Sequence, residues 1–234
     1  MKAIILAGGK GSRLAPYTTV LPKPLMPIGE FPILEVVIRQ LHGQGFKEII
    51  LAVGHLSHLL KAYFGNGSKY GVKIDYSEEE GPLGTIGPLK QIPDLRETFL
   101  LMNGDILTTL DYNKCIAYHK KKKGIMTIAT NLRNVDIDFG VPKVNAKNEI
   151  VKYDEKPALK YLVSMGIYVL EPKTLKYIKP KEKIDLPDFV NRLIAKKEKV
   201  CTYLNDAYWL DIGRHSDYEK AIIDFGKMKD KFLK

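Results

Sequence analysis

A glycine-rich loop directly follows a short apolar run near the start of the chain. The run covers residues 3–6, and the loop contains Gly8, Gly9 and Gly11. Because glycine has no Cβ, the backbone of such a loop can approach a phosphate closely and offer it several N–H donors. The loop lacks the Gly-Lys-Ser/Thr ending of a Walker A motif, and Leu14 stands where a dinucleotide fingerprint needs a third glycine. The pattern therefore predicts a phosphate site of another kind.

Two cations accompany this loop. Arg13 lies inside it, and Lys23 follows ten residues later between Pro22 and Pro24. A guanidinium suits bidentate contact with phosphate, and the prolines restrict where the lysine can move. A tight turn and a surface lysine would explain the parts separately. Their combination just past one strand favours a triphosphate site.

Two aspartates end apolar stretches elsewhere in the chain. Asp105 closes the segment FLLMNGD, and Asp211 lies in AYWLDIG. Either residue alone is equally well explained as a cap or a turn residue. Two carboxylates that converge on a phosphate site are, however, the usual means of holding Mg²⁺. Together with the loop, the pair predicts a magnesium site.

The elements that must position these residues alternate between strand and helix in the first half of the chain. Such alternation implies parallel strands with crossover helices, whose ligands bind beyond the carboxyl ends of the strands. We expect strands over 3–6, 48–53, 72–76 and 99–102, and helices over 32–44, 55–64 and 111–123.

The second half has a different texture, typical of mixed or antiparallel sheet. Strand-like pieces are separated by turns, and two helices follow with a strand between them. We expect strands over 125–132, 140–144, 150–153, 162–170 and 200–204, and helices over 186–196 and 216–232. With no internal repeat or flexible linker, the two textures are expected to be parts of one α/β fold.

Composition excludes several classes of protein. The 234 residues are 45% hydrophobic and 27% charged, with two cysteines and a net charge of +10. These values exclude collagen-like, disordered and disulfide-stapled chains. The first apolar stretch is too short for a signal sequence, so we expect a cytoplasmic protein with reduced thiols. The positive charge makes nucleotides or nucleic acid plausible partners, although lysines concentrated at 120–123 and 227–234 are better explained as solvated helix ends.

The sequence resembles the sugar-1-phosphate nucleotidyltransferases, also called sugar nucleotide pyrophosphorylases. Six segments in the family's order carry this resemblance across almost the whole chain. They are LAGGKGSRLAPYT with PKP, GPLGTIGPL, NGD at 103–105, DEKP at 154–157, GIYVL at 166–170 and WLDIG at 209–213. The resemblance implies a Rossmann-like nucleotidyltransferase fold, with a mixed, mostly parallel sheet flanked by helices and a smaller mixed or antiparallel acceptor lobe.

The resemblance also implies a reaction and its residues. A sugar 1-phosphate would attack the α-phosphorus of a nucleoside triphosphate, and pyrophosphate would leave without a covalent intermediate. Arg13 would hold the pyrophosphate and Lys23 the α-phosphate, while Asp105 and Asp211 would hold Mg²⁺. The remaining nucleotide-binding residues would be Leu6, Ala7, Gly8, Gly9, Gly11, Ser12, Gly84 and Thr85, together with Asp105. The sugar phosphate would face Gly140, Glu155, Lys156 and Gly166.

The expected organisation is a single catalytic domain. Its nucleotide-binding part covers about 1–124, its sugar-phosphate lobe about 125–200, and a closing metal-site strand and helix about 201–234. The chain ends soon after Asp211, so we do not expect the left-handed β-helical extension of some relatives.

Base and sugar stay open at this stage. The segment LGTIGPL looks most like the mannose-1-phosphate guanylyltransferases, which ranks mannose or heptose 1-phosphate guanylyl transfer first. The segment GNGSKYGVKIDYS also resembles small uridylyltransferases acting on amino-sugar phosphates, and cytidylyl or thymidylyl transfer to another hexose is a further alternative.

Two alternatives of another class are a basic nucleic-acid-binding module and an inactive regulatory homologue. The first would need aromatic residues among its lysines, and intact Arg13, Lys23, Asp105 and Asp211 argue against the second. We therefore expect neither a nucleic-acid nor a membrane partner, and leave a homo-oligomer open.

Overall fold

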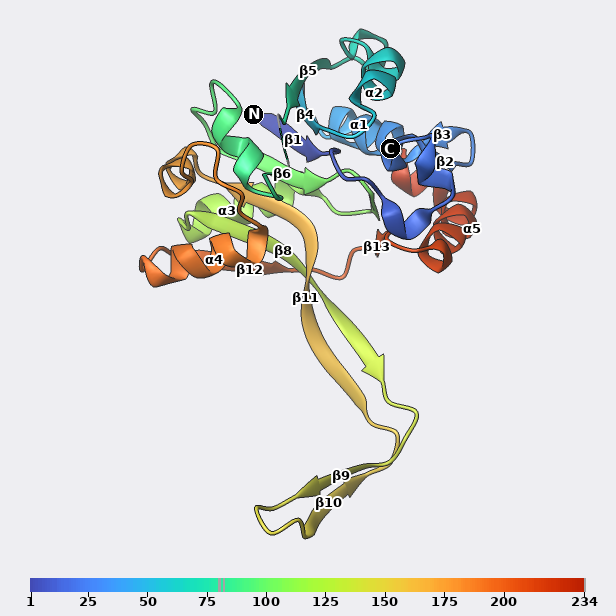
Figure 1. Cartoon of the computed structure of the whole chain (residues 1–234), viewed down its shortest axis with the longest axis vertical. Coiled ribbons are helices and arrows are strands. Elements are labelled where there is room, and N and C mark those ends of the chain that lie inside the picture. Colours follow the sequence, from blue (N-terminus) through green and yellow to red (C-terminus); the bar gives the residue numbers. More distant parts are fainter. Residues whose placement is uncertain (80, 82, 234) are drawn as a thin grey trace.

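A mostly parallel central sheet forms the middle layer of the molecule in the computed structural model, which describes residues 1–79, 81 and 83–233 (Figure 1). Within these residues the sheet has seven strands in the order β12-β8-β11-β6-β1-β4-β5. Only the two pairs made by β11 are antiparallel. The strands are β1 Lys2–Leu6, β4 Glu48–Val53, β5 Lys73–Glu78, β6 Phe99–Asn103, β8 Met126–Asp136, β11 Ala158–Leu170 and β12 Val200–Leu204. The predicted α/β sheet is confirmed.

Helices cover both faces of this sheet. Helices α1 Ile33–Gly43, α2 Ser57–Phe64 and α3 Tyr112–Lys122 lie on one face and α4 Leu186–Ala195 on the other, while α5 His215–Phe232 packs on the small sheets beside it. Helix α3 begins where the Asp111 side chain accepts a hydrogen bond from the Lys114 N–H at 2.9 Å, a standard N-cap. Helix α1 ends before Gly45, whose φ of 90° is left-handed and does not continue a helix. The predicted helices are confirmed, with shifts of a few residues at their ends.

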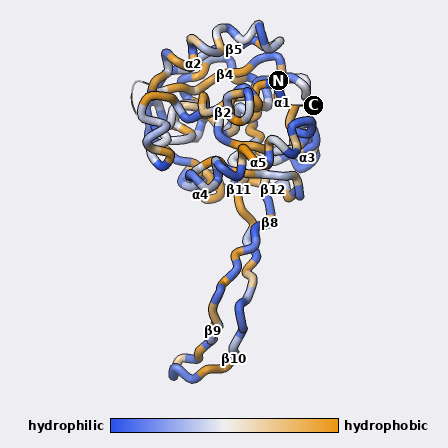
Figure 2. The backbone as a smooth tube through the Cα atoms, turned by 90° about the vertical axis from the view of Figure 1, so that its right-hand side faces the viewer, coloured by the Kyte–Doolittle hydropathy of each residue, from blue (hydrophilic) through white to orange (hydrophobic). Residues whose placement is uncertain are grey.

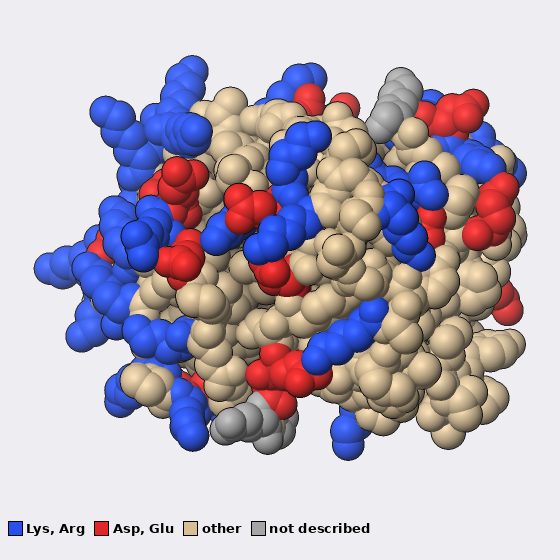
Figure 3. Space-filling model, turned by 90° about the horizontal axis from the view of Figure 1, so that it is seen from above, with Lys and Arg blue, Asp and Glu red and all other residues tan. Residues whose placement is uncertain are grey.

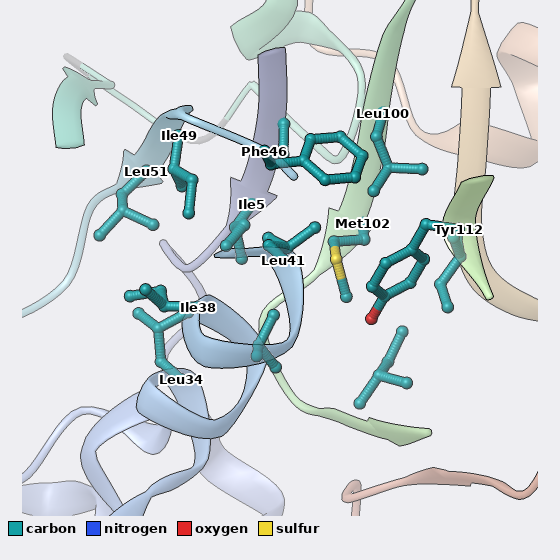
Figure 4. Packing of buried hydrophobic residues seen from close by; sticks show 14 of the residues in the cluster. Ile5, Leu34, Ile38, Leu41, Phe46, Ile49, Leu51, Leu100, Met102 and Tyr112 are labelled. Atoms are coloured by element: carbon teal, nitrogen blue, oxygen red, sulfur yellow. The ribbon is translucent and has the colours of Figure 1, made fainter. Parts of the chain in front are cut away.

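Alternating strand residues divide the core into two layers. Ile5 and Met102 point to the face covered by α1, where Leu34, Ile38 and Leu41 pack on them (Figure 4). Their chain neighbours point to the opposite face, beneath α4. This alternation is why residues 3–6 are apolar without a break, since both faces of a central strand are buried.

A third apolar cluster lies under α5. Phe225 and Phe232 of this helix pack with Leu14 from the glycine loop, Leu107 and Ile212. The cluster therefore anchors the loop and the segment that carries Asp211 to one helix.

Three small two-stranded sheets complete the fold. They are β2 Pro27–Ile28 with β3 Phe31–Pro32, β7 Ile106–Thr108 with β13 Trp209–Asp211, and β9 Val141–Val144 with β10 Ile150–Asp154. The last of these lies at the tip of a long hairpin, which continues the outer halves of β8 and β11 away from the body (Figure 2).

Both cysteines are free, and burial raises the pKa of the Cys115 thiol to about 12. No helix in the described part of the chain is long and apolar enough to cross a membrane.

Candidate active site

The glycine loop starts at the carboxyl end of β1 and packs tightly against its neighbours. A Cβ on Gly8 would lie 3.2 Å from the backbone N of Gly54, and a Cβ on Gly11 would lie 3.2 Å from Cβ of Lys23. Gly11 has a φ of 63°, and its carbonyl accepts a hydrogen bond from the Thr18 hydroxyl at 2.8 Å. The loop therefore folds back on the segment that carries Lys23.

Lys23 is buried and lies at the start of a single 3₁₀ turn, Lys23–Leu25, with Pro22 as its N-cap. Its ammonium forms a hydrogen-bonded ion pair with Oδ2 of Asp105. Oδ1 of the same carboxylate is buried with no hydrogen-bond partner. A buried carboxylate oxygen without a partner is costly in the free protein, so this atom is suited to accept a ligand.

The two predicted metal ligands come together through backbone pairing. In the β7–β13 ladder Asp211 lies opposite Ile106, and the N–H of Ile212 donates to the Asp105 carbonyl at 3.0 Å. The strand that ends at Asp211 thus belongs to this small sheet and not to the central one. Partial burial and then the charge of Asp105 raise the pKa of Asp211, while Lys23 and Arg13 act in the opposite direction.

The Asn-Gly-Asp turn is held against the end of β1. The N–H of Gly104 donates to the Leu6 carbonyl at 2.9 Å, and a Cβ on Gly104 would lie 3.0 Å from that oxygen. Arg13 reaches the other acidic segment, because its guanidinium lies 3.6 Å from where a Cβ of Gly213 would be. Both cations and both acids therefore surround the end of β1.

The segment around Gly84 and Thr85 is fixed by contacts with the start of α4. The N–H of Thr85 donates to Oδ1 of Asp185 at 3.0 Å, and the N–H of Leu186 donates to the Thr85 hydroxyl at 2.7 Å. Gly84 has a φ of 74°, and a Cβ there would lie 2.6 Å from the Ile184 carbonyl. Only glycine fits at this position.

Most of these parts line one cavity of about 480 Å³, whereas Asp211 is not among its lining residues. All the predicted nucleotide-binding residues take part in it. The lining residues are Leu6, Ala7, Gly8, Gly9, Gly11, Ser12, Arg13, Lys23, Pro24, Ala52, Glu79, Gly84, Thr85, Asn103, Gly104, Asp105, Asp185 and Gly213.

The predicted sugar-phosphate residues are not all brought to this cavity. Gly166, with a φ of 72°, lies against it, since a Cβ there would be 2.7 Å from Nδ2 of Asn103. Glu155 and Lys156 are exposed on the long hairpin. Gly140 is also there, where a Cβ would collide with the Tyr153 side chain.

Three polar residues of the cavity were not predicted as site residues from the sequence. One is Asn103, which directly precedes the Gly-Asp pair, and its nearness to Asp105 could have indicated it. Asp185 resembles an ordinary helix N-cap in the sequence, and its partner Thr85 is 100 residues away. Glu79, whose pKa is raised by burial, accepts a hydrogen bond from the Leu83 N–H at 3.1 Å, which no local pattern indicates.

Comparison with known proteins identifies the family to which the chain belongs. Residues 2–227 match the family model described as nucleotidyl transferase. The chain belongs to the nucleotidyl transferase family. The resemblance inferred from its motifs is thereby confirmed.

Relatives within the nucleotidyl transferase family cover almost the whole chain. D-glycero-α-D-manno-heptose 1-phosphate guanylyltransferase of Campylobacter jejuni is 33% identical over 227 residues, covering 96% of this chain and 100% of that protein. UTP–glucose-1-phosphate uridylyltransferase of Synechocystis sp. is 34% identical over 242 residues, covering 95% of this chain but only 62% of its relative. The crystal structure of HddC from Yersinia pseudotuberculosis complexed with GMP-PN has a TM-score of 0.72 at 25% identity, covering 96% and 99% of the two chains.

Proposed function

We propose that this chain transfers a nucleotidyl group from a nucleoside triphosphate to a sugar 1-phosphate and releases pyrophosphate. The observation that carries the proposal is the meeting of Arg13, Lys23 and Asp105 in one glycine-lined cavity. Cations and backbone N–H groups suit the triphosphate, and the family membership supports this class of reaction.

The attacking group is already an anion, so the site needs no strong general base. Catalysis then depends on alignment and on neutralising charge at the phosphates. The P–O bond to the sugar phosphate forms as the bond between the α- and β-phosphates breaks. Lys23, held by Gly11 and the prolines, would stabilise charge at the α-phosphate. Arg13 would hold the departing pyrophosphate.

The residues present fit a magnesium ion. Asp105 and Asp211 would hold it, because one oxygen of Asp105 is buried without a partner, and partial burial together with the neighbouring carboxylate raises the pKa of Asp211. Two carboxylates with phosphate and water oxygens form the ligand set that Mg²⁺ prefers. Bound there, Mg²⁺ would offset the negative charge that builds up on the phosphates. Lys23 would then exchange its ion pair with Asp105 for contact with substrate.

The nucleobase would lie against the backbone of Gly84 and Thr85. Asp185 and Thr85 hold this segment to α4, so the base side would be rigid before substrate arrives. The acceptor sugar would enter near Gly166, which is packed against Asn103 at the cavity.

Guanylyl transfer to mannose or heptose 1-phosphate is our first choice. The heptose 1-phosphate guanylyltransferase is matched over its full length, and the HddC structure is complexed with GMP-PN. Uridylyl transfer to glucose 1-phosphate is the second candidate, supported by the cyanobacterial relative at 34% identity. Either reaction fits a cytoplasmic enzyme of nucleotide-sugar synthesis.

A nucleic-acid-binding function is less well supported. On the face seen in Figure 3, acidic side chains lie among the basic ones, so they interrupt the basic surface there. An inactive homologue would have no need of the buried Lys23–Asp105 pair beside a glycine-lined cavity.

The test is a matrix of five triphosphates against a panel of sugar 1-phosphates, with pyrophosphate detection. We expect GTP with mannose or heptose 1-phosphate to give the highest kcat/KM. Turnover with another pair would revise the specificity only. No pyrophosphate release from any pair, at any magnesium concentration, would refute the proposed function.

A further inference from the structure

The long hairpin, residues 131–163, forms an arm that leaves the body (Figures 1 and 2). Strand β11 is antiparallel to both β6 and β8, so β8 runs in the same direction as β6 and β1. The arm therefore leaves the sheet at the edge that carries the cavity. It projects away from the body, so its outer residues do not cover that cavity.

Neither face of the arm is covered. Leu132 and Val135 point to opposite faces of one strand and are 50% and 43% exposed, and Phe139 is 77% exposed. Ten of the 18 exposed large apolar side chains in the described chain lie on this arm. A two-stranded ribbon is marginally stable in water by itself. These apolar side chains therefore need a second protein surface to pack against.

The arm is too long to serve its own cavity as it stands. Strands β8 and β11 pair without a break from Ala158 to Ser164, and the register shifts only between Ser164 and Tyr168. Lys156 lies eight residues before Ser164 in the sequence, a distance of roughly 26 Å along an extended strand. Neither Glu155 nor Lys156 lines the cavity. The acceptor side is thus incomplete within one chain.

Lys156 is held in a costly conformation at the arm's bend. Its φ of 44° is left-handed, a region that non-glycine residues rarely adopt. Neither Lys156 nor the adjacent Glu155 forms an ion pair with any residue that the structure describes. The exposed side chains of Glu155 and Lys156 are therefore free to bind a group that lies outside their own chain.

We propose that the arm of each chain crosses to a second copy of the same chain and completes the acceptor side of that copy's cavity with Lys156 and Glu155. This inference rests on the proposed function, because it assigns the sugar phosphate to these residues. Reciprocal exchange gives a closed two-fold dimer. In this dimer each arm supplies Lys156 and Glu155 to the partner's cavity and buries its own apolar side chains against the partner. A stable interface uses about 20 to 30 residues on each side, and residues 131–163 supply that many. A second copy is favoured over a foreign partner because every copy has the cavity that lacks these residues.

The charges on the arm also fit a protein surface. The arm's six basic residues are nearly balanced by five acidic ones. Asp154 pairs within the arm with Lys152 at 2.6 Å and with Lys143 at 3.9 Å. The arm's exposed surface is apolar between these pairs, as in an obligate interface.

The decisive experiment is complementation between two inactive variants that are co-expressed with different tags. Lys156→Ala disables the arm, and Asp105→Asn disables the cavity. If the arm acts in the partner, a mixed dimer has one intact site, and a random mixture recovers about a quarter of the wild-type activity. If the arm folds back on its own chain, the mixture stays as inactive as its components, which overturns the proposal. Lys23→Ala with Asp105→Asn is the matched control, since two cavity defects cannot complement in either arrangement.

A second experiment does not depend on turnover. A benzophenone amino acid is placed at Lys156, and the protein is irradiated without substrate. Cross-links between two chains that map near the glycine loop or the Asn-Gly-Asp turn support arm exchange, whereas cross-links within one chain refute it. If wild type shows no pyrophosphate release but does show these inter-chain cross-links, the proposed function fails and the arm exchange stands.

Sedimentation gives a third readout. Wild type should be a dimer, and Val151→Asp, on the exposed part of the arm, should shift it to monomer without loss of helix by circular dichroism. Ile223→Asp on α5 is the control, because Ile223 is similarly exposed, at 56% against 64% for Val151, and is not on the arm. A wild-type monomer at micromolar concentration would overturn the proposal.

Discussion

Lys23 and Asp105 form an ion pair although 82 residues separate them in the chain. The pair holds the ammonium at the mouth of the glycine loop. Breaking it therefore tests both the site and the proposed chemistry.

Lys23→Ala should lower kcat by about 100- to 1000-fold and change KM for the triphosphate by less than tenfold. The reason is that a cation aimed at charge developing in the transition state contributes little to ground-state binding. Steady-state kinetics on the pair chosen by the substrate matrix would measure this. Lys10→Ala, an exposed lysine in the same loop, should be near wild type. An effect confined to KM would reduce Lys23 to a binding residue.

Asp211→Asn should abolish turnover and yet slightly raise the melting temperature of the ligand-free protein, by about 1 °C because solvent screens this exposed side chain. The folded-state pKa of Asp211 is raised, so its favourable contribution exists below the unfolded-state pKa and is lost as pH rises through the folded-state value. At neutral pH the ionised side chain therefore opposes folding. Differential scanning calorimetry without magnesium would show the rise. Asp230→Asn on α5 is the control, and equal stability changes in both variants would contradict the prediction.

Gly84→Ala should raise the Kd for the triphosphate about tenfold. The added Cβ meets the Ile184 carbonyl at 2.6 Å and must adopt a left-handed φ, so the base-side segment has to move away from α4. Isothermal titration with the nucleotide would detect the loss. Gly226→Ala, which has open space around it on α5, should bind normally. Unchanged affinity in the Gly84 variant would separate this segment from the base.

The buried side chain of His119 should make the free energy of unfolding depend on pH. It is fully buried, with Thr127 Oγ1 at 2.7 Å and Glu171 Oε1 at 3.0 Å, and burial is the main cause of its lowered pKa. The unfolded chain binds a proton more readily, so stability should fall as pH drops below about 6.5. Urea unfolding at pH 7.5 and 5.5 would measure the fall. His119→Gln should show a smaller difference between the two, and an equal difference would point to other groups.

Much of the fold could be predicted because burial leaves a clear period in the sequence. The run at 3–6 and the helical spacing around Leu34, Ile38 and Leu41 each report which faces are buried. The cavity could be predicted on the same basis, since Asp105 closely follows a buried strand beside the glycine loop.

Long-range pairings left no local signal. Nothing near Asp185 indicates that it holds Thr85, and nothing near Asp211 indicates that it lies opposite Ile106 in a separate small sheet. The sequence predicts the strands around 140–153, but a period of two does not indicate which surface a hairpin packs against. The direction in which the hairpin leaves the rest of the domain was therefore not predictable.

The indole of Trp209, the single tryptophan of the chain, lies two residues before Asp211 and contacts β11 at the base of the arm. Its Nε1–H donates to the Met165 carbonyl at 2.9 Å, one residue before Gly166. Selective excitation of this ring gives a built-in fluorescent reporter at the junction of the proposed nucleotide, metal and acceptor positions. Stopped-flow emission traces could then time the order in which each of these ligands arrives, without attaching any dye.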